Sequence, residues 1–151
     1  MELVLNNPPD LERLGALLSD KDDLHLVWPE ARSPFDREQW RERLSLLPAN
    51  RSYFVAHDGE TIGHVALLET EEAKTLTVSF VFVKPEHRGR GLGVELMTLV
   101  ESEARILGAR ALRLRVRTYN PRARRVYEAA GFVPIEQTDT LVLMRKQLGE
   151  S

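Results

Sequence analysis

A glycine-rich turn restricts the fold of this chain more than any other segment. An apolar run ends at Val83, a helical pattern begins at Leu92, and glycine stands at every second position from 89 to 93. Glycine adopts positive φ without steric cost and lets a ligand approach the backbone. The N–H groups at the start of the following helix favour an anion, and Arg88 and Arg90 add positive charge. The segment therefore predicts a strand–turn–helix unit that can hold a phosphate or pyrophosphate.

Three phosphate-binding patterns can be compared with this turn. The Walker pattern does not fit, because no Gly-Lys-Ser/Thr sequence ends the turn. The dinucleotide fingerprint Gly-x-Gly-x-x-Gly does not fit, because the glycines are Gly89, Gly91 and Gly93 and residue 94 is valine. An Arg-x-x-Gly-x-Gly pattern fits from Arg88 to Gly93. A tight strand–helix turn without any ligand is the alternative.

Hydrophobic periodicity predicts the remaining elements. Asp58-Gly59 between two apolar runs is typical of a β-hairpin. In chain order we expect a helix from Leu11 capped by Asp10, a short helix or turn over 22–27, a helix capped by Ser33, strands over 53–56, 61–68 and 76–83, a helix over 92–107, a strand over 112–116, a short helix over 123–130, and strands over 133–135 and 140–144. This order predicts a mixed α/β sheet with helices on both faces.

Length and composition narrow the class of protein. A chain of 151 residues fits a single domain, here residues 1–151. It has no cysteine, which excludes a thiol nucleophile, a cysteine zinc site and a disulfide framework. The N-terminus lacks a basic region and a long apolar run, so we expect no signal peptide, no membrane span and a cytoplasmic location.

Charge is distributed unevenly along the chain. Residues 1–80 hold 15 acidic and 8 basic side chains, whereas residues 81–151 hold 8 acidic and 13 basic ones. This asymmetry is either chance or an anion site in the second half with a cation-tolerant site in the first. The arginines between 110 and 125 are accompanied by no RNA- or DNA-binding motif, so we do not expect a nucleic-acid partner.

A second motif runs from Asn120 to Phe132. It reads Asn-Pro-Arg-Ala-Arg-Arg-Val-Tyr-Glu-Ala-Ala-Gly-Phe. Taken alone, Asn120 would cap a helix, and Tyr127 would be a core residue on the apolar stripe with Ala123 and Val126. The two motifs follow one another in strand–helix–strand–helix order.

Together, the two motifs resemble those of the GNAT acetyltransferase superfamily. The family pattern is Gln/Arg-x-x-Gly-x-Gly/Ala after Val-x-Pro, here Val83-Lys84-Pro85 and Arg88–Gly93, followed by Asn-x-x-Ala-x-x-x-Tyr-x-x-x-Gly-Phe. The resemblance implies a GNAT-like, mostly antiparallel mixed α/β (α+β) sheet. It also implies that acetyl-CoA is the cosubstrate and that no metal is needed.

The resemblance assigns roles by position. The acetyl-pantetheine arm would lie along Phe82 and Val83, and Tyr127 would protonate the departing thiolate as the catalytic acid. The residues expected to bind the pyrophosphate are Arg88, Gly89, Arg90, Gly91, Leu92, Gly93 and Val94. Those expected on the pantetheine and nucleotide side are Asn120, Arg122 and Ala123.

These roles suit an N-acetyltransferase in which a primary amine of a small molecule or peptide attacks the thioester directly, with no covalent enzyme intermediate. The Val83 N–H would stabilise the tetrahedral oxyanion. Many GNAT enzymes carry a glutamate on the strand before the turn, but residues 75–81 contain no carboxylate. A general base would therefore be a water held by Thr77 and Ser79, or His64, Glu69 or Glu30. A non-catalytic acetyl-CoA sensor or regulatory domain is the alternative function.

The acceptor side is less defined by sequence. Trp28, Phe35 and Trp40 would either line an acceptor pocket or fix helices onto the sheet, and Glu30 or Asp36 would attract an ammonium group. Exposed C-terminal strands would allow a homodimer.

Overall fold

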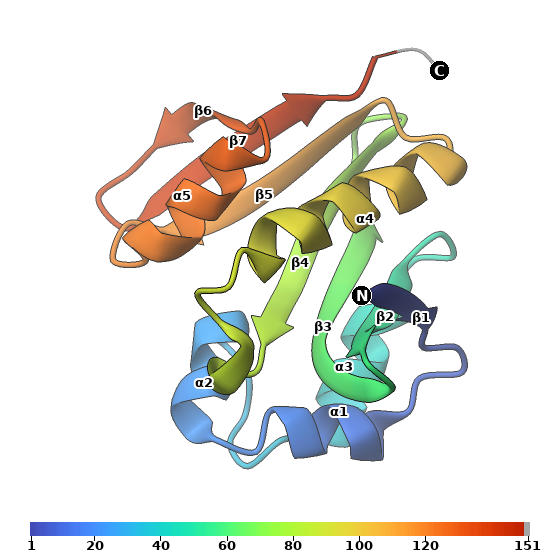
Figure 1. The fold of residues 1–151 in the computed structure, drawn as a ribbon. Coiled ribbons are helices and arrows are strands. Elements are labelled where there is room, and N and C mark those ends of the chain that lie inside the picture. The colour runs from blue at the N-terminus through green and yellow to red at the C-terminus, as the bar shows by residue number, and fades with distance from the viewer. Residues whose placement is uncertain (150–151) are drawn as a thin grey trace. The chain divides into compact units, whose positions relative to one another are not determined.

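The computed structural model describes residues 1–149, which form seven strands, five α-helices and one 3-10 turn. In chain order these are β1 (Glu2–Leu5), α1 (Leu11–Leu17), α2 (Lys21–Val27), α3 (Arg37–Leu44), β2 (Arg51–His57), β3 (Glu60–Glu69), β4 (Thr75–Val83), η1 (Pro85–His87), α4 (Leu92–Ile106), β5 (Ala111–Arg117), α5 (Pro121–Ala129), β6 (Val133–Gln137) and β7 (Leu141–Gln147). Figure 1 shows this arrangement.

The strands form one sheet in the order β1-β2-β3-β4-β5-β7-β6. The pairs β1–β2, β2–β3, β5–β7 and β6–β7 are antiparallel, and β4–β5 is parallel. The predicted mixed α/β class with a mostly antiparallel sheet is therefore confirmed. Internal contacts divide the chain into two compact units, and β4 contributes residues to both.

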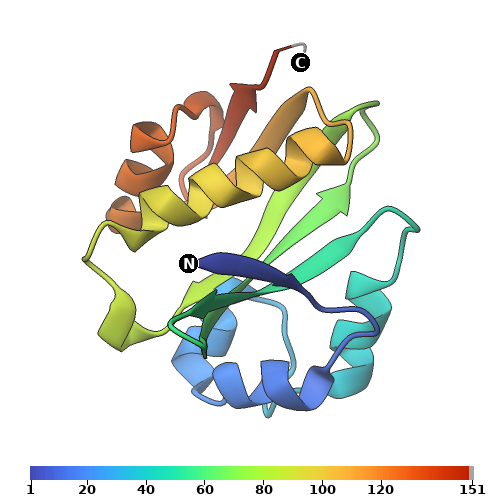
Figure 2. The same cartoon turned by 45° about the vertical axis from the view of Figure 1, so that its right-hand side comes forward.

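Unit 1 comprises residues 1–68 and 79–86. Its helices α1, α2 and α3 lie on one side of its strands in both views of the ribbon (Figures 1 and 2). Each begins at an aspartate whose carboxylate accepts backbone N–H groups of the first turn: Asp10, Asp20 and Asp36. The predicted Asp10 cap is confirmed. The predicted Ser33 cap is wrong, because Asp36 accepts from the N–H groups of Glu38 and Gln39 and starts α3 there.

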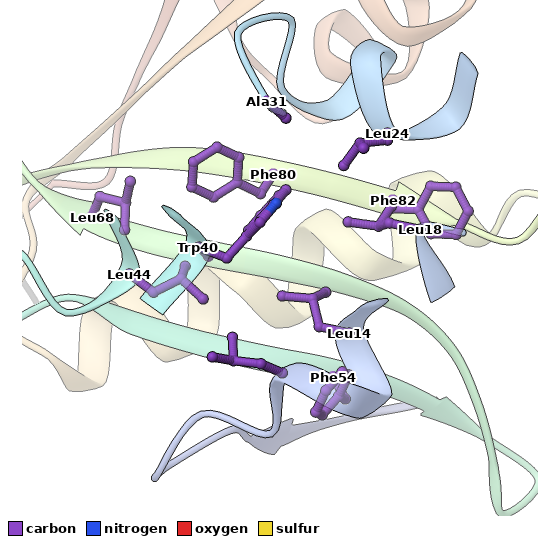
Figure 3. Close-up of a cluster of buried hydrophobic side chains, with 12 residues drawn as sticks. Leu14, Leu18, Leu24, Ala31, Trp40, Leu44, Phe54, Leu68, Phe80 and Phe82 are labelled. Carbon is purple, nitrogen blue, oxygen red and sulfur yellow. The ribbon is translucent and has the colours of Figure 1, made fainter. Parts of the chain in front are cut away.

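The core of unit 1 is a cluster of leucines and aromatic rings under these helices (Figure 3). Trp40 is fully buried at its centre. Its ring lies 4.9 Å from Trp28, 5.3 Å from Phe35 and 4.9 Å from Phe80, measured between ring centroids. Burying such rings contributes strongly to stability, and edge or tilted contacts add to it. These aromatic residues therefore fix the helices onto the strands of unit 1.

Unit 2 comprises residues 69–78 and the chain from His87 onward. Its helix α5 lies over β5 and β7 in Figure 1, and α4 packs against α5. Lys146 of β7 donates to the Ala130 carbonyl at 2.8 Å and to Glu101 of α4 at 2.6 Å. This lysine therefore ties the C-terminal end of α5 to α4.

Arginines of unit 2 pair with the connection between β3 and β4. Arg113 binds Glu71 through two hydrogen bonds of 2.8 and 3.1 Å, and Arg145 binds Glu72 through two of 2.9 Å. Hydrogen bonding to Arg113 lowers the pKa of Glu71 to about 2. Two of the basic side chains in the C-terminal half are thus used inside the unit.

Candidate functional site

The glycine turn adopts the backbone conformation that its sequence predicts. Gly89 and Gly91 have φ of 78° and 76°, the left-handed region that residues with a Cβ rarely enter. A Cβ at either position would meet nothing within 4 Å. The backbone conformation, and not crowding, therefore requires glycine at both positions.

Helix α4 begins differently from the other four helices of residues 1–149. Side chains cap those four, whereas Gly91 at the start of α4 offers no side-chain hydrogen bond. The first N–H groups of a helix have no partner within the helix, and its dipole makes this end positive. The start of this 15-residue helix, beside Arg88 and Arg90, is therefore suited to an anionic group.

Gly93 serves another purpose than the two glycines before it. Its φ is not positive, and a Cβ there would lie 2.9 Å from Cγ1 of Val126 on α5. Glycine at 93 therefore lets α5 approach the first turn of α4. The sequence motif does not distinguish the three glycines. In the structure, Gly89 and Gly91 allow a left-handed backbone, whereas Gly93 allows two helices to pack closely.

Helix α5 carries the second motif. The Asn120 side chain accepts from the N–H of Ala123 at 3.3 Å, which confirms Asn120 as a cap. None of the residues of α5 is fully buried, and Ala123, Val126 and Tyr127 keep intermediate exposure. Its apolar stripe is therefore accessible in part.

Tyr127 is the predicted catalytic acid. Its ring makes an edge contact with Phe132, with ring centroids 6.2 Å apart. Burial around the hydroxyl raises the pKa of Tyr127 to about 12. The phenol therefore keeps its proton at neutral pH, which is the state a proton donor needs.

Phe82 and Val83 end β4 in unit 1. The Phe82 side chain is 4% exposed and belongs to the aromatic and aliphatic core, so any ligand there would meet its backbone. Gly63 of β3 comes so close that a Cβ on it would lie 2.1 Å from the Phe82 carbonyl oxygen. Sequence reasoning missed Gly63, because nothing in the local pattern reveals its contact 19 residues further along the chain.

His64 is not placed to act as a general base. It is fully buried, its Nε2 lies 2.7 Å from Oγ of Ser52, and its Nδ1 lies 2.9 Å from the Phe80 carbonyl oxygen. Burial lowers the pKa of His64 to about 4, although the hydrogen bond to Phe80 opposes the shift. Both ring nitrogens are therefore used inside the core.

The other residues considered for the base or the acceptor differ in exposure. Thr77 and Ser79 on β4 and Glu69 at the end of β3 are half-buried, and Glu30 is exposed. Asp36 caps α3 and pairs with Arg32 at 3.0 Å, which lowers its pKa. Asp36 is thus already engaged by a cation of this chain.

Two absences concern the described residues alone. Within residues 1–149, no group of three or more His, Asp or Glu side chains is arranged to hold a metal ion. No helix in that part of the chain is long and apolar enough to cross a membrane.

The model of the Acetyltransferase (GNAT) family matches residues 17–132. The chain therefore belongs to the GNAT acetyltransferase family and is an acyltransferase. An aminoglycoside N(6')-acetyltransferase type 1 from Stenotrophomonas maltophilia is 29% identical over 134 residues, covering 83% of each chain.

Solved structures share the fold. Spermidine N-acetyltransferase from Vibrio cholerae, in complex with CoA and spermine, has a TM-score of 0.79 at 21% identity and covers 97% of this chain and 94% of its own. An aminoglycoside acetyltransferase in complex with coenzyme A and kanamycin has a TM-score of 0.77 at 20% identity, covering 97% of this chain and 94% of its own. At these identities the likeness concerns the fold.

Proposed function

We propose that this chain is an N-acetyltransferase that moves the acetyl group of acetyl-CoA onto a primary amine of a small molecule or peptide. The observation that carries the proposal is the start of α4, which has two left-handed glycines and no side-chain cap in a chain of the GNAT family. We propose that both units act together as one domain over residues 1–151.

The pyrophosphate of the cosubstrate would bind the backbone of Arg88, Gly89, Arg90, Gly91, Leu92, Gly93 and Val94. The two arginines would add charge-assisted hydrogen bonds. Asn120, Arg122 and Ala123 at the start of α5 would contact the pantetheine and nucleotide side. The end of β4 at Phe82 and Val83 would carry the acetyl-pantetheine arm.

The transfer would proceed by direct attack. The neutral amine adds to the thioester carbonyl, the Val83 N–H stabilises the oxyanion, and the C–S bond breaks. Tyr127 would donate its proton to the departing sulfur, and its high pKa keeps that proton available at neutral pH. Because His64 is fully hydrogen-bonded in the core, the amine proton would leave through a water near Thr77 and Ser79 or through Glu69.

The relatives support an amine as the acceptor, because their names specify aminoglycosides, spermine and kanamycin. An excess of acidic side chains in residues 1–80 favours a cationic acceptor. Spermidine and kanamycin are therefore the first acceptors to measure.

The first test is thermal unfolding with acetyl-CoA, with ATP and NAD as controls. Saturation at 100 times the dissociation constant adds about 2.7 kcal/mol of stability. Selective stabilisation by acetyl-CoA supports the site, and an equal shift with ATP contradicts it.

Release of coenzyme A in the presence of amines then separates an enzyme from a non-catalytic sensor. Tyr127→Phe should lower kcat about 100-fold or more while acetyl-CoA still binds.

We also propose a homodimer formed through β6 and a cytoplasmic location. Strand β6 ends the strand order, and Val133 and Ile135 on it are 57% and 51% exposed. An exposed edge strand can pair with a second copy. Light scattering at several protein concentrations would give the mass of the assembly, and a monomer throughout would contradict the dimer. Cell fractionation tests the location.

A further inference from the structure

Strand β4 is distorted shortly before the end that we assign to the acetyl arm. Phe80 has φ of 51°, although it is a bulky residue inside a strand. A positive φ at such a residue is costly and persists only where the surroundings determine it. The contacts around Phe80 should therefore include the groups that hold this conformation.

The neighbouring strand β3 supplies one such contact through the absence of a side chain. Gly63 leaves room for the Phe82 carbonyl, which would otherwise meet a Cβ at 2.1 Å. The pairing of β2 with β3 shifts register between Val55 and Ala56, opposite this glycine. The Ile62 carbonyl accepts from the Lys84 N–H at 2.8 Å. Residues 62 and 63 thus adapt β3 to the end of β4.

His64 supplies the second contact. The Phe80 carbonyl can only accept, so Nδ1 of His64 must carry the proton that it donates over 2.9 Å. In a neutral ring Nε2 then accepts from the Ser52 hydroxyl at 2.7 Å. The Ser52 oxygen accepts in turn from the Asn6 side-chain amide at 3.1 Å.

In this chain of hydrogen bonds each group accepts on one side and donates on the other. At the end away from Phe80, the Asn6 side-chain oxygen accepts from the Asp10 N–H at 2.7 Å at the start of α1. Asn6, Ser52 and His64 are all buried, so each of these groups needs its partner. Reversing the ring tautomer would put two acceptors face to face at Phe80.

We propose that His64 is a positioning residue, which holds the Phe80 carbonyl and thereby the distorted end of β4, while Ser52 and Asn6 complete the hydrogen bonds on the side of the ring nitrogen that accepts. The inference rests on the proposed function, because Phe82 and Val83 follow Phe80 directly on this strand. His64 contacts neither cosubstrate nor acceptor in this role. It acts through the backbone that follows Phe80.

Two amide variants separate this role from simple core packing. In His64→Asn the amide nitrogen occupies the place of Nδ1 and can still donate to Phe80. In His64→Gln it occupies the place of Nε2 and faces Ser52 instead. Both variants replace the imidazole ring with a smaller amide side chain, so the position of the donor is the main difference between them.

The measurement is kcat and KM for acetyl-CoA with spermidine or kanamycin as acceptor, with circular dichroism as the folding control. We expect His64→Gln to lower kcat about tenfold or more, since small misplacements of reacting groups carry such costs, and His64→Asn to retain several times more activity. A larger kcat effect than KM effect is expected. Equal losses in both variants would overturn the positioning role.

A second measurement covers the case in which a variant does not fold. Nuclear magnetic resonance of ¹⁵N-histidine-labelled wild type should show His64 neutral and protonated on Nδ1 at pH 7. A proton on Nε2 would overturn the inference without any variant. If wild type neither binds acetyl-CoA nor acetylates amines while the ring shows the expected tautomer, the proposed function fails and the hydrogen-bond chain stands as a structural feature only.

Discussion

The two units accommodate a glycine contact in different ways. In unit 1, Gly63 faces a backbone atom, the Phe82 carbonyl oxygen, which a Cβ would approach to 2.1 Å. In unit 2, Gly93 faces a side chain, and a Cβ there would lie 2.9 Å from Cγ1 of Val126. A side chain can rotate or be shortened, but a strand carbonyl moves only with its strand. The end of β4 should therefore tolerate far less change than the contact between α4 and α5.

The polar interactions of the two units also differ. His64, Ser52 and Asn6 in unit 1 are buried and depend on hydrogen bonds away from water. In unit 2, Glu71 and Glu72 pair with arginines at the surface, where solvent and salt weaken each pair. Four measurements test whether the two units differ in this way.

Gly63→Ala should have the largest effect. The added methyl collides with backbone, so we expect a loss of about 3 kcal/mol or more in the free energy of unfolding, or no folded protein. Chemical denaturation measures it. Gly15→Ala is the matched control, because its Cβ would meet the movable ring of Phe35 at 3.0 Å. Equal costs at the two positions would contradict the distinction.

The pH dependence of stability should report the burial of His64. Its pKa is lowered from 6.5 to about 4 in the folded chain, so the unfolded chain binds the proton more readily. The contribution of the neutral, buried His64 ring to stability is therefore fully present above pH 6.5. It falls as the pH drops toward 4, by about 3 kcal/mol at most. The readout is the free energy of unfolding of wild type minus that of His64→Asn at each pH. A difference that does not change with pH would show that His64 titrates normally.

Gly93→Ala should destabilise the fold less than Gly63→Ala does, and a second substitution should restore much of the lost stability. Crowding against Val126 is expected to remove about 1–3 kcal/mol. Val126→Ala in the same chain should recover much of this loss, because it removes the colliding methyl groups. A double-mutant cycle on the free energy of unfolding measures the coupling. Additive effects would mean that α4 and α5 adjust without strain.

Glu72→Gln should have the smallest effect on stability. It weakens the paired hydrogen bonds from Arg145, which lie at the surface. The difference from wild type should shrink further in about 1 M NaCl, where the Debye length is about 3 Å. Thermal unfolding at low and high salt measures it. A loss as large as that of Gly93→Ala would show that surface pairs stabilise unit 2 as strongly as packing does.

Local patterns predicted much of the fold. The hairpin at Asp58-Gly59 is confirmed, with φ of 50° and 78° between β2 and β3. The glycine turn before α4 and the Asn120 cap are confirmed as well. The N-terminal strand β1 was missed, because its four residues precede two prolines and depend on pairing with β2.

The site was less predictable where its contacts join distant residues. The sequence places His64 among other strand residues, and only the structure brings its Nδ1 to the Phe80 carbonyl. The contact of Gly93 with Val126 likewise joins two motifs that local periodicity cannot align. Register between strands and contact between helices decide these roles, and a single sequence contains no direct signal for either.

The start of α4 has a consequence for how this protein can change over generations. Alone among the five helices of the described chain, it begins without a side chain of its own to complete the first turn. If the bound anion performs that task, the empty enzyme is held below the stability it could reach. A change in this turn that supplied a side-chain cap would then be favoured by selection for heat resistance and opposed by selection for turnover. Variants recovered in a screen for thermal tolerance should therefore be checked in this turn for lost activity.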